Sequence, residues 1–319
     1  MTISPHVPVM VSEVLQYLGV RAGGRYIDAT IGLGGHAEAI LEASSPDGQL
    51  VGCDIDPEAV EGARQRLQRF GDRVQILRCP YEELADRLPL EQWDGVLFDL
   101  GAGSYHFDRP ERGFSFQKDG PLDMRFDPET EETAADIVNR ASFEELVELF
   151  KEIGEEPFAR RIARAIERQR QLAPIRTTRE LALLIERVVP VRPQRIHPAT
   201  RVFMALRIRV NRELERLRGG LDAARRLLKP GGRLVCLAFH SGEVRVVREF
   251  GRRWSRDYDY PGEVDVPELR RPRPPQLRWV VDHAIRPTEE EIEQNPRARS
   301  ANLFVLEKLA LDNREGGRG

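Results

Sequence analysis

Cysteine and long apolar runs are both scarce in this 319-residue chain. Its three cysteines, Cys53, Cys79 and Cys236, lie far apart, and no two have the CxxC spacing of a zinc site or a redox pair. We expect small core residues there and predict no metal site. Residues 95–100 and 234–239 are apolar but far shorter than the roughly 18 residues of a membrane span, and no signal-peptide pattern opens the chain. The sequence therefore predicts a cytoplasmic protein without a membrane segment.

Lysine is scarce as well, since only four of the 49 cationic side chains are lysines. The formal net charge is only −3, but it hides a separation of charge along the chain. Residues 127–156 carry eleven carboxylates against two cations, whereas residues 158–218 carry sixteen arginines against five glutamates. Two readings stay open: the two segments pair within the molecule, or the arginines form a surface for phosphates, which suit the planar guanidinium.

A hydrophobic content of 40% is enough to build a core, which excludes a disordered or fibrous chain. The first hundred residues alternate short β-branched runs with helical patterns, as in a parallel sheet covered by helices. The predicted strands are residues 25–30, 49–54, 74–79 and 94–100, and the helices between them are residues 35–43, 57–70 and 81–88.

From about residue 105 to residue 200 the pattern is helical, with a capping box formed by Ser142 and Glu145. A long helix at 203–228 then leads through a Lys-Pro-Gly-Gly turn to another buried strand at 234–239. Further strand candidates are residues 276–285 and 302–308. We therefore predict an α/β fold with a doubly wound, mostly parallel sheet and a helical insertion. The predicted divisions are residues 1–106 and 201–319 for the sheet domain and 107–200 for an insertion that recognises the substrate.

A glycine-rich loop follows the first predicted strand. Residues 28–36 read Asp-Ala-Thr-Ile-Gly-Leu-Gly-Gly-His, and Asp54 ends the second strand 22 residues after Gly32. Glycines allow close approach to the backbone and a carboxylate can bind a ribose diol, which indicates a nucleotide-type cofactor. The spacing is not the G-x-G-x-x-G of dinucleotide sites, and Asp28 would face an anionic pyrophosphate. Asp28 suits S-adenosylmethionine, which carries an ammonium and a sulfonium; the alternative is a plain glycine turn with Asp28 as a helix cap.

Three further side chains belong to this predicted site. The fourth strand brings Asp99 to the same edge of the sheet, close to the expected place of the methyl group. Tyr81 follows the third strand, where it either stacks on adenine or is a core aromatic. His36 is either a core or capping histidine or a cofactor contact.

The most specific string in the chain is Arg-Gly-Phe-Ser-Phe-Gln-Lys-Asp-Gly-Pro-Leu-Asp-Met-Arg at residues 112–125, because generic fold physics does not require it. It resembles a motif of the bacterial RsmH (MraW) methyltransferases, which methylate the exocyclic amine of a cytidine in 16S ribosomal RNA with S-adenosylmethionine. Further matching stretches are residues 6–9, 26–36, 154–156, 160–166, 197–201, 205–208, 210–214 and 295–300.

The resemblance implies a class I (Rossmann-like) methyltransferase fold and an rRNA (cytosine-N4-)-methyltransferase. The cofactor contacts that it implies are Gly34, Gly35, His36, Asp54, Tyr81, Asp99 and His106, beside Asp28 and Gly32 from the loop pattern. The implied partner is 16S ribosomal RNA or the small ribosomal subunit, and the oligomeric state, a homodimer included, stays open.

Two stretches depart from the family pattern. Where the family has D-L-G-V-S-S-x-Q-L-D, this chain has Gly103 for a serine and His106 for the glutamine. Where the family has F-H-S-L-E-D-R, it has Gly242 and Val244 for the leucine and the aspartate. A diverged paralogue with another or weaker activity is therefore one alternative, and a nicotinamide oxidoreductase is another.

A cytosine amine is a poor nucleophile, so in-line positioning and hydrogen-bond acceptors must supply most of the catalysis. We expect Asp99 to be the main acceptor, with Ser104, His240 and Ser241 as second candidates. For RNA we expect contacts from Arg161, Arg164 and Arg168, whose spacing of three and four places them on one helical face.

Overall fold

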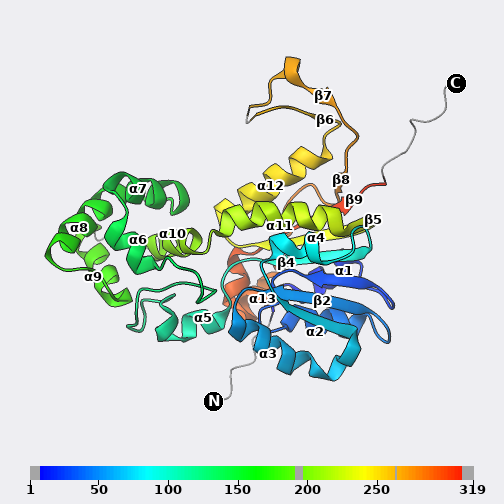
Figure 1. The fold of residues 1–319 in the computed structure, drawn as a ribbon, viewed down its shortest axis with the longest axis horizontal. Helices are drawn as coiled ribbons and strands as arrows, with labels where there is room; N and C mark the ends of the chain where they lie inside the picture. The colour runs from blue at the N-terminus through cyan, green and yellow to red at the C-terminus, as the bar shows by residue number, and fades with distance from the viewer. Residues whose placement is uncertain (1–7, 191–196, 263, 311–319) are drawn as a thin grey trace. The chain divides into compact units, whose positions relative to one another are not determined.

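The computed structural model describes residues 8–190, 197–262 and 264–310 and contains two compact units. One unit comprises residues 1–101 and 214–319, and the other comprises residues 102–213 (Figure 1). The second unit begins five residues before and ends thirteen residues after the predicted 107–200. The reason is that helices α5 (Ser104–Asp108) and α10 (Thr200–Val210) pack within this unit. The residues outside these ranges include His6 of the family motif, Arg192 and Arg195.

The first unit is built on a seven-stranded sheet with the order β3-β2-β1-β4-β5-β9-β8. Its strands are β1 (Arg25–Asp28), β2 (Gln49–Asp54), β3 (Val74–Arg78), β4 (Trp93–Asp99), β5 (Leu228–Ala238), β8 (Leu277–Trp279) and β9 (Asn302–Lys308). The first five are parallel, whereas β9 is antiparallel to both of its neighbours. This confirms the predicted doubly wound, mostly parallel sheet.

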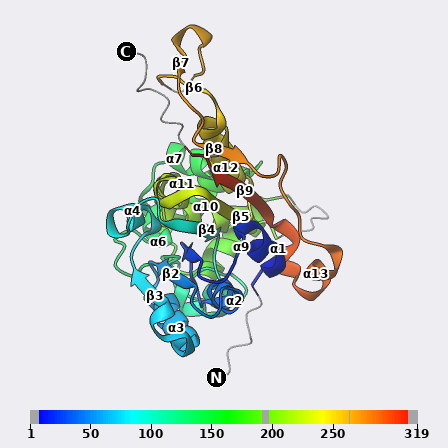
Figure 2. The same cartoon turned by 90° about the vertical axis from the view of Figure 1, so that its right-hand side faces the viewer.

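Helices cover both faces of this sheet (Figure 2). On one face lie α1 (Val11–Leu18), α2 (Gly35–Ala43) and α3 (Pro57–Leu67), and on the other lie α4 (Leu84–Arg87), α11 (Glu213–Leu227) and α12 (Ser241–Ser255). Strand residues alternate between the two cores: Tyr26 and Leu97 belong to the first, Ile27 and Phe98 to the second. Burial on both faces explains why these strands are continuous apolar runs.

The connections reverse direction between β1 and β4. From β1 the chain proceeds outward through β2 and β3, and from β4 it proceeds the other way to β5. Such a switch point leaves a crevice at the carboxyl ends of the two central strands, where open α/β sheets bind their ligands.

Three local predictions were wrong. Residues 203–228 are not one helix, because Arg212 has φ +50° and separates α10 from α11. The predicted turn at 229–232 lies inside β5, where the register against β4 shifts after the Trp93–Leu228 pair. The predicted strand at 276–285 is only three residues long, with one further bridge from Ile285 to Leu303.

The second unit is helical. Its main elements are α5, α6 (Ala134–Arg140), α7 (Phe143–Glu148), a turn of π-helix (Leu149–Ile153), α8 (Ala159–Leu172), α9 (Thr178–Val188) and α10. The capping box of Ser142 and Glu145 is confirmed, and Thr133 and Thr177 begin α6 and α9 in the same way. The buried side chains of these helices form one core around Phe150, Ile162 and Leu206.

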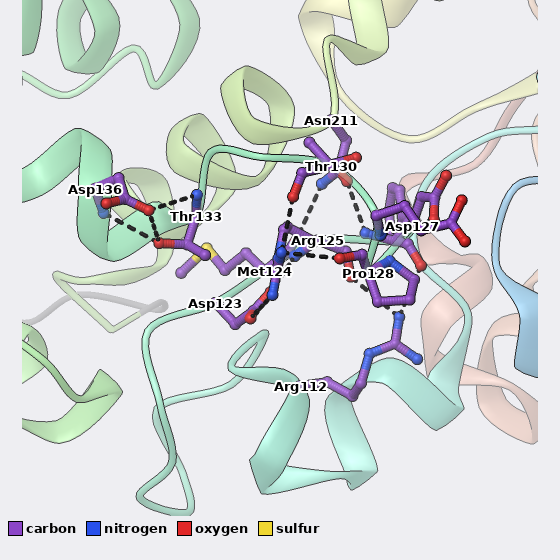
Figure 3. A network of polar contacts seen from close by, with 12 residues as sticks. Arg112, Asp123, Met124, Arg125, Asp127, Pro128, Thr130, Thr133, Asp136 and Asn211 are labelled. Carbon is purple, nitrogen blue, oxygen red and sulfur yellow. Dashed lines mark hydrogen bonds and ion pairs between the residues drawn. The ribbon is translucent and has the colours of Figure 1, made fainter.

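A polar network folds the loop that carries the family-specific string (Figure 3). Arg112 donates to the carbonyls of Arg125 and Phe126, at 3.0 and 3.1 Å. Arg125 forms an ion pair with Asp123 at 2.8 Å and donates to two more carbonyls of the loop. The two arginines of the motif thus hold the backbone of residues 125–130.

Asn211 closes this network from the end of α10. Its Nδ2 donates to the carbonyl of Met124 and its Oδ1 accepts from the N–H of Phe126, both at 2.8 Å. Met124 itself has φ +67°, a left-handed conformation that costs free energy in a non-glycine residue and needs outside support.

The described residues include no helix that is long and apolar enough to cross a membrane.

We predict that Asn211→Ala lowers the free energy of unfolding by about 1 to 3 kcal/mol, since it strips partners from two buried backbone groups beside the strained Met124. Urea denaturation measures this. The control is Gln171→Ala on the exposed part of α8, which should stay within about 0.5 kcal/mol of the wild type. Equal stability of the two variants would show that the Asn211 contacts are dispensable.

Candidate functional site

Three strands end in aspartate at the same edge of the sheet. Asp28, Asp54 and Asp99 are the last residues of β1, β2 and β4. Asp28 on β1 pairs with Gly52 on β2 and with Leu97 on β4, each two residues before the end of its strand. The three strands therefore end close together, at the switch point of the sheet. The structure therefore brings together the three carboxylates that the sequence predicted at this edge.

Asp54 and the glycine loop support each other. Oδ2 of Asp54 accepts from the N–H of Gly32 at 3.1 Å, and Oδ1 accepts from Asp56 at 3.0 Å. Gly32 and Gly34 have φ of +50° and +81°, which favour glycine. Each carboxylate oxygen can accept a second hydrogen bond, so Asp54 keeps capacity for a ribose hydroxyl while it holds the loop.

Gly35 begins α2 and lies against Pro8. A Cβ at Gly35 would lie 2.9 Å from a Pro8 carbon, too close for any side chain. The segment at 8–10 therefore lies directly over the start of α2, and only glycine fits beneath it. This explains the second of the paired glycines in structural terms, and its role as a cofactor contact stays a prediction.

Asp28 is almost fully buried, with 1% of its surface exposed. Burial raises its pKa to about 7, although the charge of His36 and a hydrogen bond from Thr30 oppose the shift. Burial likewise raises the pKa of Asp54 to about 6, against its backbone hydrogen bonds. Within the described part of the chain, neither carboxylate forms an ion pair with lysine or arginine. The site is therefore a partly buried acidic cluster with no lysine or arginine partner in the described part of the chain.

His36 links this cluster to the N-terminal segment. Its ring is buried, with Nε2 2.8 Å from the carbonyl oxygen of Val9 and Nδ1 3.5 Å from Oδ2 of Asp99. Burial lowers the pKa of His36, but contact with Asp99 and the charge of Asp28 outweigh it, and the net pKa is raised. His36 is thus buried with polar contacts on both ring nitrogens, and its role as a cofactor contact stays a prediction.

Thr30 is a member of this site that the sequence reasoning missed. Its Oγ1 accepts from the backbone N–H of Asp99 at 2.7 Å and so ties the end of β4 to the loop after β1. The available signal was a hydroxyl side chain two residues after the strand-end Asp28. The carbonyl of Val9 was missed as well, since a backbone acceptor leaves no mark in the sequence.

Tyr81 begins the 3-10 turn after β3. Its ring makes an edge contact with Phe98 at 5.4 Å, and a Cβ on Gly220 would come within 2.4 Å of it. The ring is half-buried and fixed in place, and its stacking on adenine stays a prediction.

His240 begins α12 as its N-cap. Its Nδ1 accepts from the N–H of Glu243 at 3.4 Å, while the carboxylate of Glu243 accepts from the backbone of Phe239 and His240. The altered positions Gly242 and Val244 flank Glu243, and both members of the capping box are kept. Ser241 is the exposed first residue of the helix. The catalytic roles of His240 and Ser241 stay predictions.

Ser104 and His106 belong to the helical unit, where they lie in α5. The ring of His106 is buried against Tyr105, Phe114 and Phe126, with centroids 4.0 to 4.9 Å apart. A Cβ at position 103 would lie 2.5 Å from the Tyr105 ring. The glycine that replaces the family's serine therefore leaves room for this tyrosine. Ser104 and His106 therefore remain predicted site residues.

The arginine face of α8 exists as predicted. Arg161, Arg164 and Arg168 are exposed, opposite Ile162 and Ile166, which are buried in the helical core. None of the three arginines forms an ion pair within the described residues, so the reading as an internal charge match does not apply to them. Internal charge pairing does occur elsewhere in the helical unit, where Arg209 and Glu132 form an ion pair at 3.3 Å.

Known proteins match the chain over nearly its whole length. A model of the MraW methylase family matches residues 3–309. The ribosomal RNA small subunit methyltransferase H of Thermomicrobium roseum is 50% identical over 313 residues, which cover 97% of this chain and 95% of that protein. Proteins of the same name from Dehalococcoides mccartyi (strain BAV1) and Carboxydothermus hydrogenoformans are 49% and 46% identical, over 96% of this chain and 87% and 98% of theirs.

The buried Asp28 leads to a prediction on stability. A folded pKa of about 7, against an ordinary value of 3.8, means that its contribution is fully present below about pH 4 and is lost as the pH rises through 7. Asp28→Asn removes the charge, so the gain in free energy of unfolding over the wild type should grow from about pH 4 to about pH 8, by on the order of 2 to 4 kcal/mol.

Denaturation of both proteins across this pH range measures the difference, in which most other titrating groups cancel. Asp47→Asn, at an exposed position, is the matched control and should show no such trend. A difference that shrinks as the pH rises would contradict the prediction.

Proposed function

Since the chain belongs to the MraW methylase family, we propose that it transfers a methyl group from S-adenosylmethionine to the exocyclic amine, N4, of a cytidine in 16S ribosomal RNA. At the coarser level the chain is a methyltransferase for the ribosomal RNA of the small subunit, with S-adenosyl-L-methionine as its cofactor. The cytidine and its N4 atom are the finer part of the proposal, and they rest on the string at residues 112–125. We place the activity in the cytoplasm.

The observation that carries the proposal is the acidic cluster at the switch point. Asp28 is buried and Asp54 is partly buried, both have raised pKa values, and neither has a lysine or arginine partner among the described residues. A cationic ligand nearby stabilises the charged forms of these carboxylates, which burial disfavours, whereas a pyrophosphate would disfavour them further. S-adenosylmethionine therefore fits this edge, and a nicotinamide dinucleotide does not.

The protein's own groups then have distinct tasks. Bound S-adenosylmethionine supplies an electrophilic methyl group on its sulfonium. Asp54 and the loop around Gly32 and Gly34 hold the nucleoside part, because they offer an acceptor and close backbone approach. Asp99, at the end of β4, accepts a hydrogen bond from the amine as the nitrogen lone pair becomes available for attack.

The RNA itself is held, in this proposal, by the arginine face of α8. Three exposed guanidiniums without carboxylate partners offer bidentate contacts to phosphates. A base in a duplex cannot reach a recessed sheet edge, so we expect the target cytidine in a loop or turned out of its stack.

A diverged paralogue remains the second candidate, because the family pattern is altered at Gly103, His106, Gly242 and Val244. The local packing favours the first candidate: Gly103 is matched to Tyr105, and the capping box of His240 and Glu243 is kept beside Gly242.

The decisive measurement is nucleoside mass spectrometry of small-subunit ribosomal RNA from a strain that lacks this gene. We expect N4-methylation of one cytidine to be lost and to return with the wild-type gene. Asp99→Asn should bind S-adenosylmethionine but fail to restore it, because the acceptor for the amine is weakened. Unchanged modification in the deletion strain would exclude the rRNA activity and favour the paralogue.

The arginine face gives a separate prediction. Replacing Arg161, Arg164 and Arg168 by glutamine should weaken RNA binding and lower the slope of log affinity against log salt by about 2. The melting temperature and the cofactor affinity should not change, since the three side chains are exposed.

The matched control neutralises Arg245, Arg248 and Arg252, three exposed arginines with the same spacing on α12. It removes the same charge from the other unit. Equal losses of salt dependence in the two triple variants would contradict a specific role of α8.

A further inference from the structure

The hydrogen bonds of His36 decide where its protons are. Nε2 lies 2.8 Å from the carbonyl oxygen of Val9 in the buried start of α2. A carbonyl oxygen can only accept a hydrogen bond, so Nε2 must carry a hydrogen and donate it. Nδ1 is then the only ring nitrogen whose protonation varies.

Nδ1 faces the carboxylate of Asp99, with 3.5 Å between Nδ1 and Oδ2. If the ring were neutral and Asp99 ionised, a nitrogen lone pair would point at a negatively charged oxygen. Two acceptors in contact at a buried position repel each other. The arrangement therefore favours a proton between Nδ1 and Oδ2.

The surroundings favour this proton on the imidazole. Burial and the amino end of α2 both disfavour a positive ring. Against them, the carboxylates of Asp99 on β4 and Asp28 on β1 face the ring, and Asp54 on β2 lies next to Asp28. The net pKa of His36 is raised, and among the described residues no lysine or arginine forms an ion pair with these groups.

Asp99 is held on two sides. Its backbone N–H donates to Oγ1 of Thr30 at 2.7 Å, which fixes the end of the strand, and Oδ2 faces the His36 ring. Oδ1 has no hydrogen bond or ion pair in the described part of the chain. One oxygen is thus committed, and the other remains as an acceptor in a fixed direction.

We propose that His36 is a positioning residue, whose doubly protonated ring holds Oδ2 of Asp99 so that Oδ1 is aimed as the acceptor for the substrate amine. The role of Oδ1 rests on the proposed function. The protonation of His36 does not, and it can be measured without RNA.

The first test is nitrogen NMR of the histidine side chains in the full chain near pH 7, with His36→Gln to assign the signal. We expect both ring nitrogens of His36 to carry protons in the wild type. In Asp99→Asn the ring should become neutral, with a hydrogen on Nε2 alone, because the negative partner of Nδ1 is gone. A wild-type His36 that is already neutral near pH 7 would overturn the proposal.

The second test separates the two contacts of the ring. The amide nitrogen of asparagine lies close to the position of Nδ1, and that of glutamine close to Nε2. His36→Asn therefore keeps a donor toward Asp99, whereas His36→Gln keeps the donor toward Val9.

We expect His36→Gln to lose kcat by about ten- to a hundredfold, because Asp99 is no longer held in direction, and to lose less in cofactor affinity than in kcat. His36→Asn should recover a large part of this kcat while its melting temperature falls. Equal kcat in both variants, with only stability affected, would reduce His36 to a structural residue. If the wild type methylates no ribosomal RNA, the proposed function fails, and the NMR result still decides the protonation of His36.

Discussion

The burial of Asp28 beside two further carboxylates is the constraint on which the candidate site depends. Asp28, Asp54 and Asp99 end three neighbouring strands, and parallel pairing leaves them no other edge. Backbone N–H groups of Thr30, Gly32 and Asp56 face two of them, and His36 faces the third. These donors lower the cost of the charges without removing it: the pKa of Asp28 is raised mainly by burial, and the charges of Asp99 and Asp54 add to the shift. The free chain is thus less stable than an apolar edge would make it, which is the usual cost of a site arranged for a charged ligand.

The parts of the fold that could be read from the sequence are those that depend on neighbours along the chain. β2, β9 and α2 were predicted residue for residue, because β-branched runs and the glycine loop mark their ends. The break between α10 and α11 could not be predicted, because Asn211 is held by Met124, 87 residues away. In the site, the strand-end aspartates were readable from position alone, whereas the carbonyl of Val9 and the hydroxyl of Thr30 become partners only through folding.

The two arginines of the motif at residues 112–125 are not available for a ligand in the way that their charges in the sequence suggest. Arg112 and Arg125 point at backbone carbonyls and at Asp123, so they are engaged within the loop. Arg161, Arg164 and Arg168 on α8 are the opposite case, since they are exposed, lie opposite the buried apolar face of the helix and make no ion pair among the described residues. Two sets of arginines in one unit thus differ in accessibility, a difference that counting charges along the sequence does not reveal.

The scarcity of lysine has a practical consequence for the chemical labelling of α8. The four lysines are Lys118, Lys151, Lys229 and Lys308; Lys229 is paired with Asp94, and Lys308 is buried against the carbonyl of Arg225. None lies on α8. Amine-directed dyes, biotin esters and cross-linkers will therefore attach elsewhere and leave the guanidiniums of Arg161, Arg164 and Arg168 unmodified. Dicarbonyl reagents, which react with guanidinium groups, are the chemistry that footprints this face.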